Sequence, residues 1–176
     1  IADINALSAG QLQSFIAPQI KVLSLTQLGG FNSTQVNNLT TAQLRAMTTA
    51  QRNALGTAAF AELTTEQVKA LTTAQVAALN ETQVGSLTST ALSAFSSTQL
   101  GALTTSALNA LTQEQIQALS TSQIAGLTAT QIAGLRSTDL GELTTTQIAG
   151  LTATQIAALE PVDLGGLSTA QVGALT

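Results

Sequence analysis

The segment Leu71-Thr72-Thr73-Ala74-Gln75-Val76-Ala77-Ala78 holds, in eight residues, the pattern that decides the fold. The same pattern, L-[ST]-x-x-Q-[ILV]-x-[AG], recurs every eight residues along the chain without an insertion or deletion. Large apolar residues occupy all 22 positions of the series from Leu7 to Leu175, and all of the series from Ile4 to Val172 except Arg52. A fixed short period is typical of repeat architectures. Residues 1–176 are therefore expected to form a single repeat domain of 22 octapeptide units without distinct capping repeats.

Each unit carries the signals that start a helix. A Ser or Thr followed three residues later by Gln is a capping box: Thr72 accepts a hydrogen bond from the backbone N–H of Gln75, and the Gln75 side chain accepts one from the N–H of Thr72. Leu71 and Val76 flank this cap as a hydrophobic staple, which sets the angle at which the chain enters the helix. Pro161 falls at a first helical position, where its missing N–H costs nothing. Each repeat is thus predicted to be one very short helix preceded by a corner.

Other regular structures do not fit a period of eight. In one continuous helix, eight residues turn by about 800°, so the apolar stripe would wind around the helix and face no single partner. A coiled coil needs a heptad, and apolar spacings of three and five would place successive side chains on opposite faces of a strand. A disordered Ser-, Thr- and Gln-rich linker has a similar composition but no reason to keep its apolar residues in phase. The predicted fold class is an all-α solenoid of very short helices.

Stacking must stabilise these helices, because an isolated helix of this length is unstable in water. A single cap residue leaves little room for a full reversal, which favours three repeats, or 24 residues, per superhelical turn. Lys21, Arg45 and Lys69 repeat with this spacing. The Ala or Gly that ends each unit is expected to let neighbouring helices approach closely. Two repeats per turn is the alternative, because the alanines that replace Gln share a 16-residue phase: Ala59, Ala91 and Ala107.

The composition argues against several classes of function. Only 8% of the residues are charged and the net charge is −4, so the five basic residues make no patch for nucleic acid. Without Cys or His there are no disulfides, Cys/His zinc sites or histidine acid–base chemistry. No apolar run approaches the roughly 18 residues of a membrane helix. With no phosphate-binding loop or catalytic signature either, we expect no enzyme activity, no cofactor and no membrane span.

Arg52 is the one charge at a core position of the pattern. As a functional residue it would be a buried contact for an anion. The structural interpretation is that its side chain reaches the surface or pairs with Glu62 or Glu66. We favour the structural interpretation.

Carboxylates near the C-terminus suggest two kinds of chemistry. Asp139, Glu142 and Asp163 could act as the paired acids of a glycosidase, and Asp139, Asp163 and Glu160 could ligate a metal ion. However, Asp139 and Asp163 occupy the capping Gln position, where an acid suits the helix N-terminus. We therefore predict structural roles, and assign no catalytic, cofactor-binding or metal-binding residue.

Ser and Thr recur at fixed spacing and would form ladders on a solenoid. Capping explains the first of each pair: Thr40, Thr48, Thr64, Thr72, Thr88, Thr104, Thr112, Thr128, Thr144 and Thr152. A second Thr often follows without a local structural reason: Thr41, Thr49, Thr65, Thr73, Thr105 and Thr145. A regular Thr-rich face could bind ice, a glycan or a protein, which makes a binding module the alternative function. The pattern does not define which residues would bind the ligand.

The run of L-T-x-x-Q-[IV]-x-[AG] units from Leu7 to Leu175 resembles the repeat tracts of very large bacterial secreted or cell-surface proteins, many of them adhesin-like. The resemblance implies an extracellular or cell-surface protein with a structural role, as the stalk of an adhesin or the subunit of a surface filament. The glycine-aspartate calcium nonapeptide of many such proteins is absent here. Because the apolar pattern continues to both ends, the expected partners are further repeats of a longer chain or other copies stacked head to tail.

Overall fold

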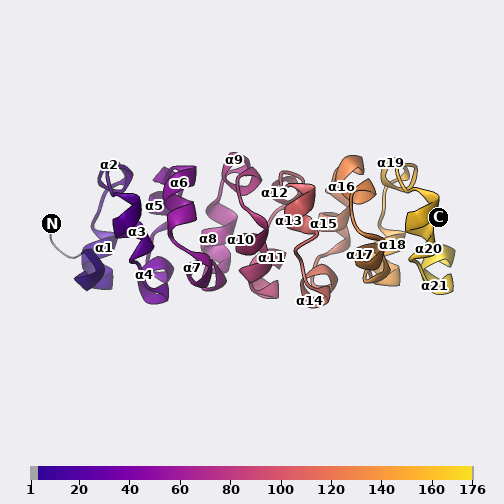
Figure 1. Ribbon diagram of the computed structural model, residues 1–176, viewed down its shortest axis with the longest axis horizontal. Helices are drawn as coiled ribbons and strands as arrows, with labels where there is room; N and C mark the ends of the chain where they lie inside the picture. Colours follow the sequence, from indigo (N-terminus) through magenta and orange to yellow (C-terminus); the bar gives the residue numbers. More distant parts are fainter. Residues whose placement is uncertain (1–3, 176) are drawn as a thin grey trace.

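The computed structural model describes residues 4–175, and its described part is an elongated rod of short helices with the two ends of the chain at opposite ends of the rod (Figure 1). Residues 1–3 and 176 of the expected domain lie outside the described residues. A 3-10 helix, η1 (Ile4–Ala6), precedes α-helices of four to six residues, one in each repeat. They are α1 (Ala9–Gln13), α2 (Ala17–Lys21), α3 (Leu25–Gly29), α4 (Ser33–Asn37), α5 (Thr41–Ala46), α6 (Thr49–Ala54), α7 (Thr57–Ala61), α8 (Thr65–Ala70), α9 (Thr73–Ala77), α10 (Glu81–Ser86), α11 (Ser89–Ser93), α12 (Ser97–Leu100), α13 (Thr105–Leu108), α14 (Gln113–Gln117), α15 (Thr121–Ala125), α16 (Ala129–Ala133), α17 (Ser137–Gly141), α18 (Thr145–Ala149), α19 (Ala153–Ile156), α20 (Pro161–Gly165) and α21 (Thr169–Gly173).

The predicted capping box starts most of these helices. At α9 the Thr72 N–H donates to Gln75 Oε1 over 3.0 Å, and the Gln75 N–H donates to Thr72 Oγ1 over 3.2 Å. Helix α7 is an exception, because Gly56 and Ala59 replace the two capping residues and no side chain caps its start. Gly56 has φ of +76°, a conformation that glycine adopts far more readily than other residues. The capping box therefore forms as predicted where the consensus Ser or Thr and Gln are present.

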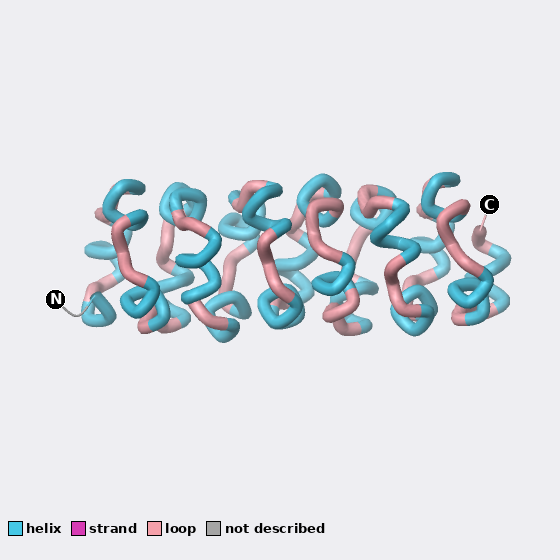
Figure 2. The backbone as a smooth tube through the Cα atoms, turned by 45° about the horizontal axis from the view of Figure 1, so that its top comes forward, coloured by secondary structure: helices cyan, strands magenta, loops and turns pink. Residues whose placement is uncertain are grey.

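Successive helices turn around the rod axis and stack on the helices three units away. Packed pairs include α1 with α4, α2 with α5, and α18 with α21. This confirms the solenoid and favours three repeats per turn over two. We call each turn of the superhelix a coil (Figure 2). Side-chain hydrogen bonds between coils join residues 23 to 31 apart, such as Arg52 with Gln75 and Gln131 with Leu100. Along the upper edge of the rod in Figure 1 lie, among others, α2, α6, α9, α16 and α19, so a coil takes slightly more than three units and a column of helices three apart winds slowly around the rod.

The core runs along the inside of the superhelix. The two predicted apolar positions of each repeat supply most of it: Leu100 and Leu103, for example, are both buried. These side chains form one continuous cluster from Ile4 to Leu151, with Leu159, Leu167 and Leu175 packed against it at the end of the chain. Each coil thus buries its apolar residues between the coil before it and the coil after it.

Close contact between coils requires small residues where helices cross. Gly126, at the end of α15, lies against Ser97 of α12, and a Cβ added there would overlap the Cβ of Ser97. Replacing Gly126 with Ala should lower the free energy of unfolding by about 1–2 kcal/mol, because the strain of overpacking exceeds the gain from a less flexible unfolded chain. Urea unfolding followed by circular dichroism measures this loss.

Gly10 provides the matched control for this prediction. It lies within α1, and no atom stands within 4 Å of the Cβ that alanine would add. Gly10→Ala should therefore leave stability unchanged or raise it by up to about 1 kcal/mol. Equal effects of the two substitutions would contradict close packing at Gly126.

Candidate functional site

The capping glutamines make a second set of hydrogen bonds, which the octapeptide pattern does not predict. In α16, Gln131 Oε1 accepts from the Thr128 N–H over 2.7 Å, as in any capping box. Its Nε2 donates to the carbonyl oxygens of Leu100 and Leu103 in the previous coil, over 3.1 and 2.7 Å. One buried amide thus starts its own helix and satisfies carbonyl groups at the C-terminal end of α12. The side chain is only 4% exposed.

This arrangement repeats along the rod and forms what we call the glutamine ladder. Its members donate to carbonyl oxygens 28 to 31 residues earlier, except Gln83, which donates to Asn53 Oδ1 over 3.1 Å. The other members are Gln35, Gln43, Gln51, Gln67, Gln75, Gln99, Gln115, Gln123, Gln131, Gln147, Gln155 and Gln171. The ladder is the main polar connection between coils.

One signal in the sequence could have revealed the ladder. Glu caps a helix in this box as well as Gln does, and its charge suits the helix N-terminus better. Yet no repeat has Glu at the capping position, where Gln, Ala and Asp are found. A carboxylate has no N–H to donate to the carbonyls of the previous coil, so the absence of Glu indicates that both ends of the amide are used.

The structure gives the Asp139 carboxylate a structural partner. Asp139 is 3% exposed, and both of its oxygens accept hydrogen bonds from Arg136, over 2.8 and 2.9 Å. Arg136 in turn donates to the carbonyl oxygen of Asn109 over 2.6 Å, the type of bond that the glutamine ladder makes elsewhere. Asp139 raises the pKa of the Arg136 guanidinium by hydrogen bonding and by its charge. Together the two residues replace one glutamine.

Unlike Asp139, Asp163 caps its own helix, accepting from the Glu160 N–H over 2.8 Å. Among residues 4–175 no three His, Cys, Asp or Glu side chains gather where they could hold a metal ion. Glu160 and Asp163 thus lie at the start of α20, and Asp139 and Glu142 lie at the start and the end of α17. The predicted cap forms at Asp163, whereas Asp139 has a different structural role, the pairing with Arg136.

Removing Arg136 should destabilise the protein, because the buried Asp139 carboxylate loses its hydrogen-bond donor. Arg136→Ala leaves Asp139 without its donor and should lower the free energy of unfolding, by less than the loss of a fully buried pair because Arg136 is largely exposed to solvent. Adding Asp139→Gln restores the consensus amide, so the double variant should recover most of the loss. Chemical denaturation of both variants measures the difference. A double variant no more stable than Arg136→Ala alone would refute the replacement.

Both parts of the structural interpretation of Arg52 are wrong. The side chain is 2% exposed and does not reach the surface. The ion pairs of the described chain join Lys69 with Glu66 and Arg136 with Asp139, so neither expected acid pairs with Arg52. Instead its Nη1 donates to the carbonyl oxygen of Gln75 in the next coil over 2.9 Å, because that coil covers the core position.

The buried guanidinium of Arg52 is incompletely satisfied. Nη2 donates to Thr49 Oγ1 over 3.2 Å, whereas Nε has no hydrogen-bond partner among the described residues. Burial lowers the pKa of Arg52, since it disfavours the charged form. Arg52 is therefore a local weakness of the core.

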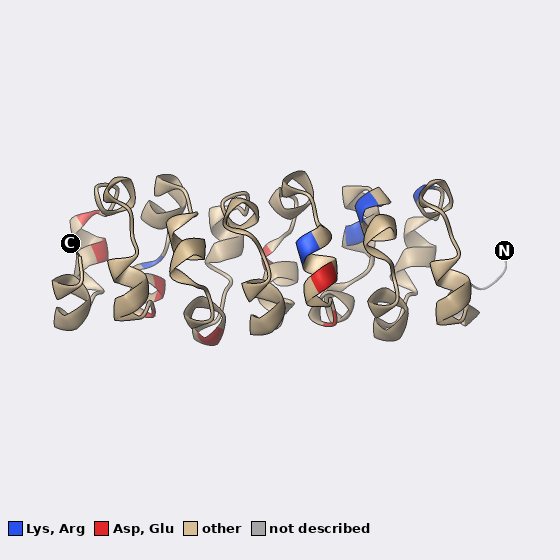
Figure 3. Ribbon diagram, turned by 180° about the vertical axis from the view of Figure 1, so that it is seen from behind, with Lys and Arg blue, Asp and Glu red and all other residues tan. Residues whose placement is uncertain are grey.

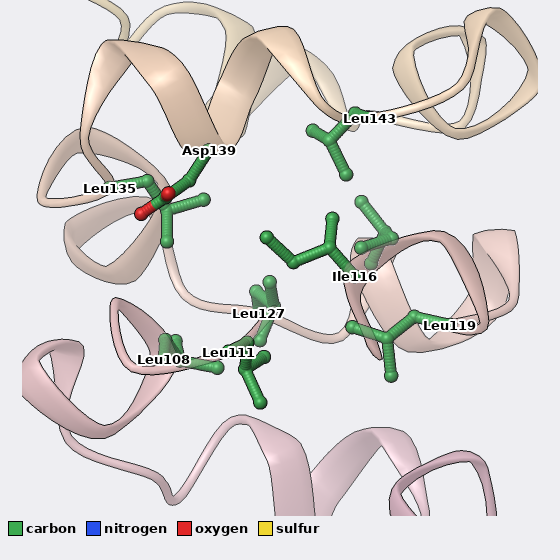
Figure 4. A pocket seen from close by; sticks show the side chains of 9 residues that line it. Leu108, Leu111, Ile116, Leu119, Leu127, Leu135, Asp139 and Leu143 are labelled. Atoms are coloured by element: carbon green, nitrogen blue, oxygen red, sulfur yellow. The ribbon is translucent and has the colours of Figure 1, made fainter. Parts of the chain in front are cut away.

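A small cavity with a volume of about 20 Å³ lies between α13 and α17 (Figure 4). Eight of the nine residues that line it are Leu or Ile, such as Leu108 and Ile116, and Asp139 is the ninth. A cavity of this size holds about one water molecule. It is therefore too small to be a substrate site.

None of the described helices combines the length and apolarity needed to cross a bilayer.

The charged residues concentrate on one of the three columns of helices. Of the 13 charged residues that the structure describes, ten belong to the repeats of α2, α5, α8, α14, α17 and α20 (Figure 3). They are Lys21, Arg45, Glu66, Lys69, Glu114, Arg136, Asp139, Glu142, Glu160 and Asp163. The column formed by α3, α6, α9, α12, α15, α18 and α21 has only Arg52, which is buried. The rod is thus chemically different on its different sides.

The uncharged column carries a stripe of paired hydroxyls, which we call the hydroxyl column. Every helix from α6 to α21 in this column starts with a Ser or Thr pair: Thr48 and Thr49, Thr72 and Thr73, Ser96 and Ser97, Ser120 and Thr121, Thr144 and Thr145, and Ser168 and Thr169. Of the second threonines singled out in the sequence, Thr49, Thr73 and Thr145 lie here, whereas Thr41, Thr65 and Thr105 lie on the other columns. The stripe winds from the upper edge of the rod at α6 and α9 to the lower edge at α21 (Figure 1). It is regular, but not flat.

Comparison with known families identifies the repeat over part of the chain. A family model described as the ALTTAQ repeat matches residues 30–65 and 53–82. Ala70 to Gln75 spell that name letter by letter. The matches cover less than a third of the chain and show a recognised short repeat there. None of the curated proteins matches the chain.

Proposed function

We propose that this chain is an extracellular structural element, the stalk of a surface adhesin or the subunit of a surface filament. The observation that carries the proposal is the glutamine ladder, which connects coil to coil from Gln35 to Gln171 in a rod with its chain ends far apart (Figure 1). A rod built from one repeated joint holds two points at a fixed distance. Each added coil lengthens it without changing its cross-section.

The resemblance to repeat tracts of secreted adhesins supports a location outside the cell. An extracellular rod is compatible with the absence of cysteine, because buried aliphatic residues and capped helices hold each coil without a disulfide. The ALTTAQ repeat match supports the repeat character of residues 30–82 and is neutral on location.

Labelling of intact source cells with an antibody to this chain tests the location. Signal before permeabilisation is expected. Signal only after permeabilisation would contradict a surface role. Negative-stain electron microscopy of the purified chain tests the shape: single rods of uniform width indicate a stalk, long filaments indicate a filament subunit, and compact particles would contradict both.

A second candidate is a binding module that uses the hydroxyl column. Its support is the absence of exposed charge from six successive helix starts that present paired hydroxyls. Because the stripe winds, it suits a glycan chain or an extended protein segment that can follow it, more than the flat surface of ice.

A panel of immobilised glycans tests this second candidate. The triple variant Thr73→Lys, Thr121→Lys and Thr145→Lys should lose binding, because long charged side chains cover the hydroxyls. The matched control Thr41→Lys, Thr65→Lys and Ser137→Lys adds the same charge to the charged column and should bind like the wild type. Equal binding by all three proteins, or no binding by the wild type, would exclude a glycan ligand on this stripe.

A further inference from the structure

The glutamine ladder is interrupted inside the rod, at α7 (Figure 1). Ala59 stands at the capping position of this helix and has no amide to donate to the coil before it. Ala91 stands at the position from which a glutamine would reach the carbonyl oxygens of Phe60 and Leu63, so the coil after α7 makes no ladder bond to it either. Of the described helices from α4 to α17, which all have a coil on each side, α7 alone lacks both bonds.

The repeat before α7 has two further defects. By the spacing of the ladder, Gln83 would reach the carbonyl oxygens of Arg52 and Leu55, but it donates to Asn53 Oδ1 instead. The guanidinium of Arg52 is buried at the same place, and its Nε has no partner among the described residues. The missing bonds and the buried charge thus fall within one half-coil, residues 52–63, which we call the ladder gap.

Helix α7 also starts less firmly than its counterparts. Gly56 offers no side chain to cap it, and the Phe60 N–H donates to the Gly56 carbonyl oxygen over 3.4 Å. In α15, by comparison, the Ser120 side chain caps the helix and the Ile124 N–H donates to the Ser120 carbonyl oxygen over 3.0 Å. An uncapped start leaves N–H groups of the first turn without a partner in the protein.

Apolar packing remains as the connection between α7 and the helices on which it stacks, α4 and α10. Phe60 and Leu63 are both buried in these contacts. Burial of apolar surface has no preferred direction, whereas a hydrogen bond fixes the distance and angle between two groups. At α15 such bonds hold both sides, because Gln123 donates to the Phe95 carbonyl oxygen over 2.8 Å and Gln155 donates to that of Leu127 over 2.7 Å.

We infer that the rod opens at the ladder gap before it opens at any other point between α4 and α17. In a stack where each coil contacts only its neighbours, the weakest connection decides where the stack separates. The inference goes beyond the proposed structural role and does not depend on it. In a stalk under tension, the ladder gap would fix the point that yields first.

Hydrogen exchange of the intact chain, followed by mass spectrometry, tests the inference. After correction for intrinsic rates, the backbone amides of residues 57–63 should exchange at least about 10-fold faster than those of residues 121–127, the equivalent segment of α15. A difference of this size corresponds to the loss of one or two hydrogen bonds between coils. Equal exchange of the two segments, or faster exchange at another coil between α4 and α17, would overturn the inference.

A variant that repairs the ladder gives the sharper test. Ala59→Gln with Ala91→Gln supplies both missing amides and leaves Gly56, whose φ of +76° other residues disfavour, in place. Exchange of residues 57–63 should slow by at least about 10-fold. The control Ala74→Gln with Ala153→Gln adds the same side chains at exposed positions and should leave this exchange unchanged. A repaired chain without slower exchange at α7 would contradict the role of the missing bonds.

The converse variant transfers the defects to α15. Ser120→Gly, Gln123→Ala and Gln155→Ala remove its side-chain cap and both of its ladder bonds. Residues 121–127 should then exchange about as fast as residues 57–63. Unchanged exchange of residues 121–127 would overturn the inference. If this variant loses its helical circular dichroism altogether, the repaired variant and its control still decide the question.

Discussion

Replacing Gln131 with Glu is expected to lower the free energy of unfolding by about 3–5 kcal/mol, the largest loss that we predict for a single substitution. The carboxylate can still accept from the Thr128 N–H and cap α16. It cannot donate to Leu100 and Leu103, and it would place a buried negative charge against their carbonyl oxygens. Urea unfolding by circular dichroism, analysed with a nearest-neighbour model because repeat proteins can unfold in parts, measures the loss.

This loss should depend on pH. Burial disfavours the charged carboxylate, so the pKa of the new Glu should be higher in the folded than in the unfolded chain. A protonated carboxyl group has one O–H to donate. Stability is therefore retained below the ordinary Glu pKa of about 4.3 and lost as the pH rises through the higher folded pKa. A deficit that is the same at acidic and neutral pH would contradict the role of the missing donor.

Gln11 supplies the matched control for Gln131. It occupies the same place in its repeat and makes the same cap, with its N–H₂ group unbonded among the described residues. Gln11→Glu should change the stability of the single chain by less than about 0.5 kcal/mol. A large effect at both positions would mean that capping, and not the bond between coils, controls stability.

Replacing Arg52 with Leu is expected to raise the free energy of unfolding by about 1–4 kcal/mol. The substitution restores an apolar residue at a position that is apolar in all of the other repeats. It removes a buried cation whose Nε has no partner and fills the site with a side chain of the kind that packs at Leu44 and Leu100. The cost is the hydrogen bond to the Gln75 carbonyl, worth about 1 kcal/mol.

Arg45→Leu is the control for Arg52→Leu. Arg45 is exposed and its Nε donates to the Ala70 carbonyl over 2.6 Å, so it also bonds the next coil but is not buried in the core. Its replacement should lower stability slightly or leave it unchanged. Destabilisation by Arg52→Leu would show that the buried guanidinium supports the fold, and would return the anion-contact hypothesis to consideration.

The parts of the structure that were predictable from the sequence depend on neighbours within one repeat. Thr72, Gln75 and the apolar pair around them specify a capped helix and a corner whatever lies elsewhere. The parts that were not predictable depend on the coil above or below. Arg52 had no route to solvent because residues 23 positions later cover it. The Arg136–Asp139 pair was not predictable for the same reason, because Arg136 bonds the Asn109 carbonyl oxygen in the previous coil.

The glutamine ladder also determines how the chain can fold. Its bonds never reach further than 31 residues along the sequence, however long the rod becomes. Contacts of such limited range keep the relative contact order low, and proteins of low contact order fold fast. A chain that emerges from one end, from a ribosome or through a pore, can therefore add each coil to the last as soon as about four repeats are free. The folding time of a longer rod therefore rises in proportion to its length, because no coil depends on a contact with a distant part of the sequence.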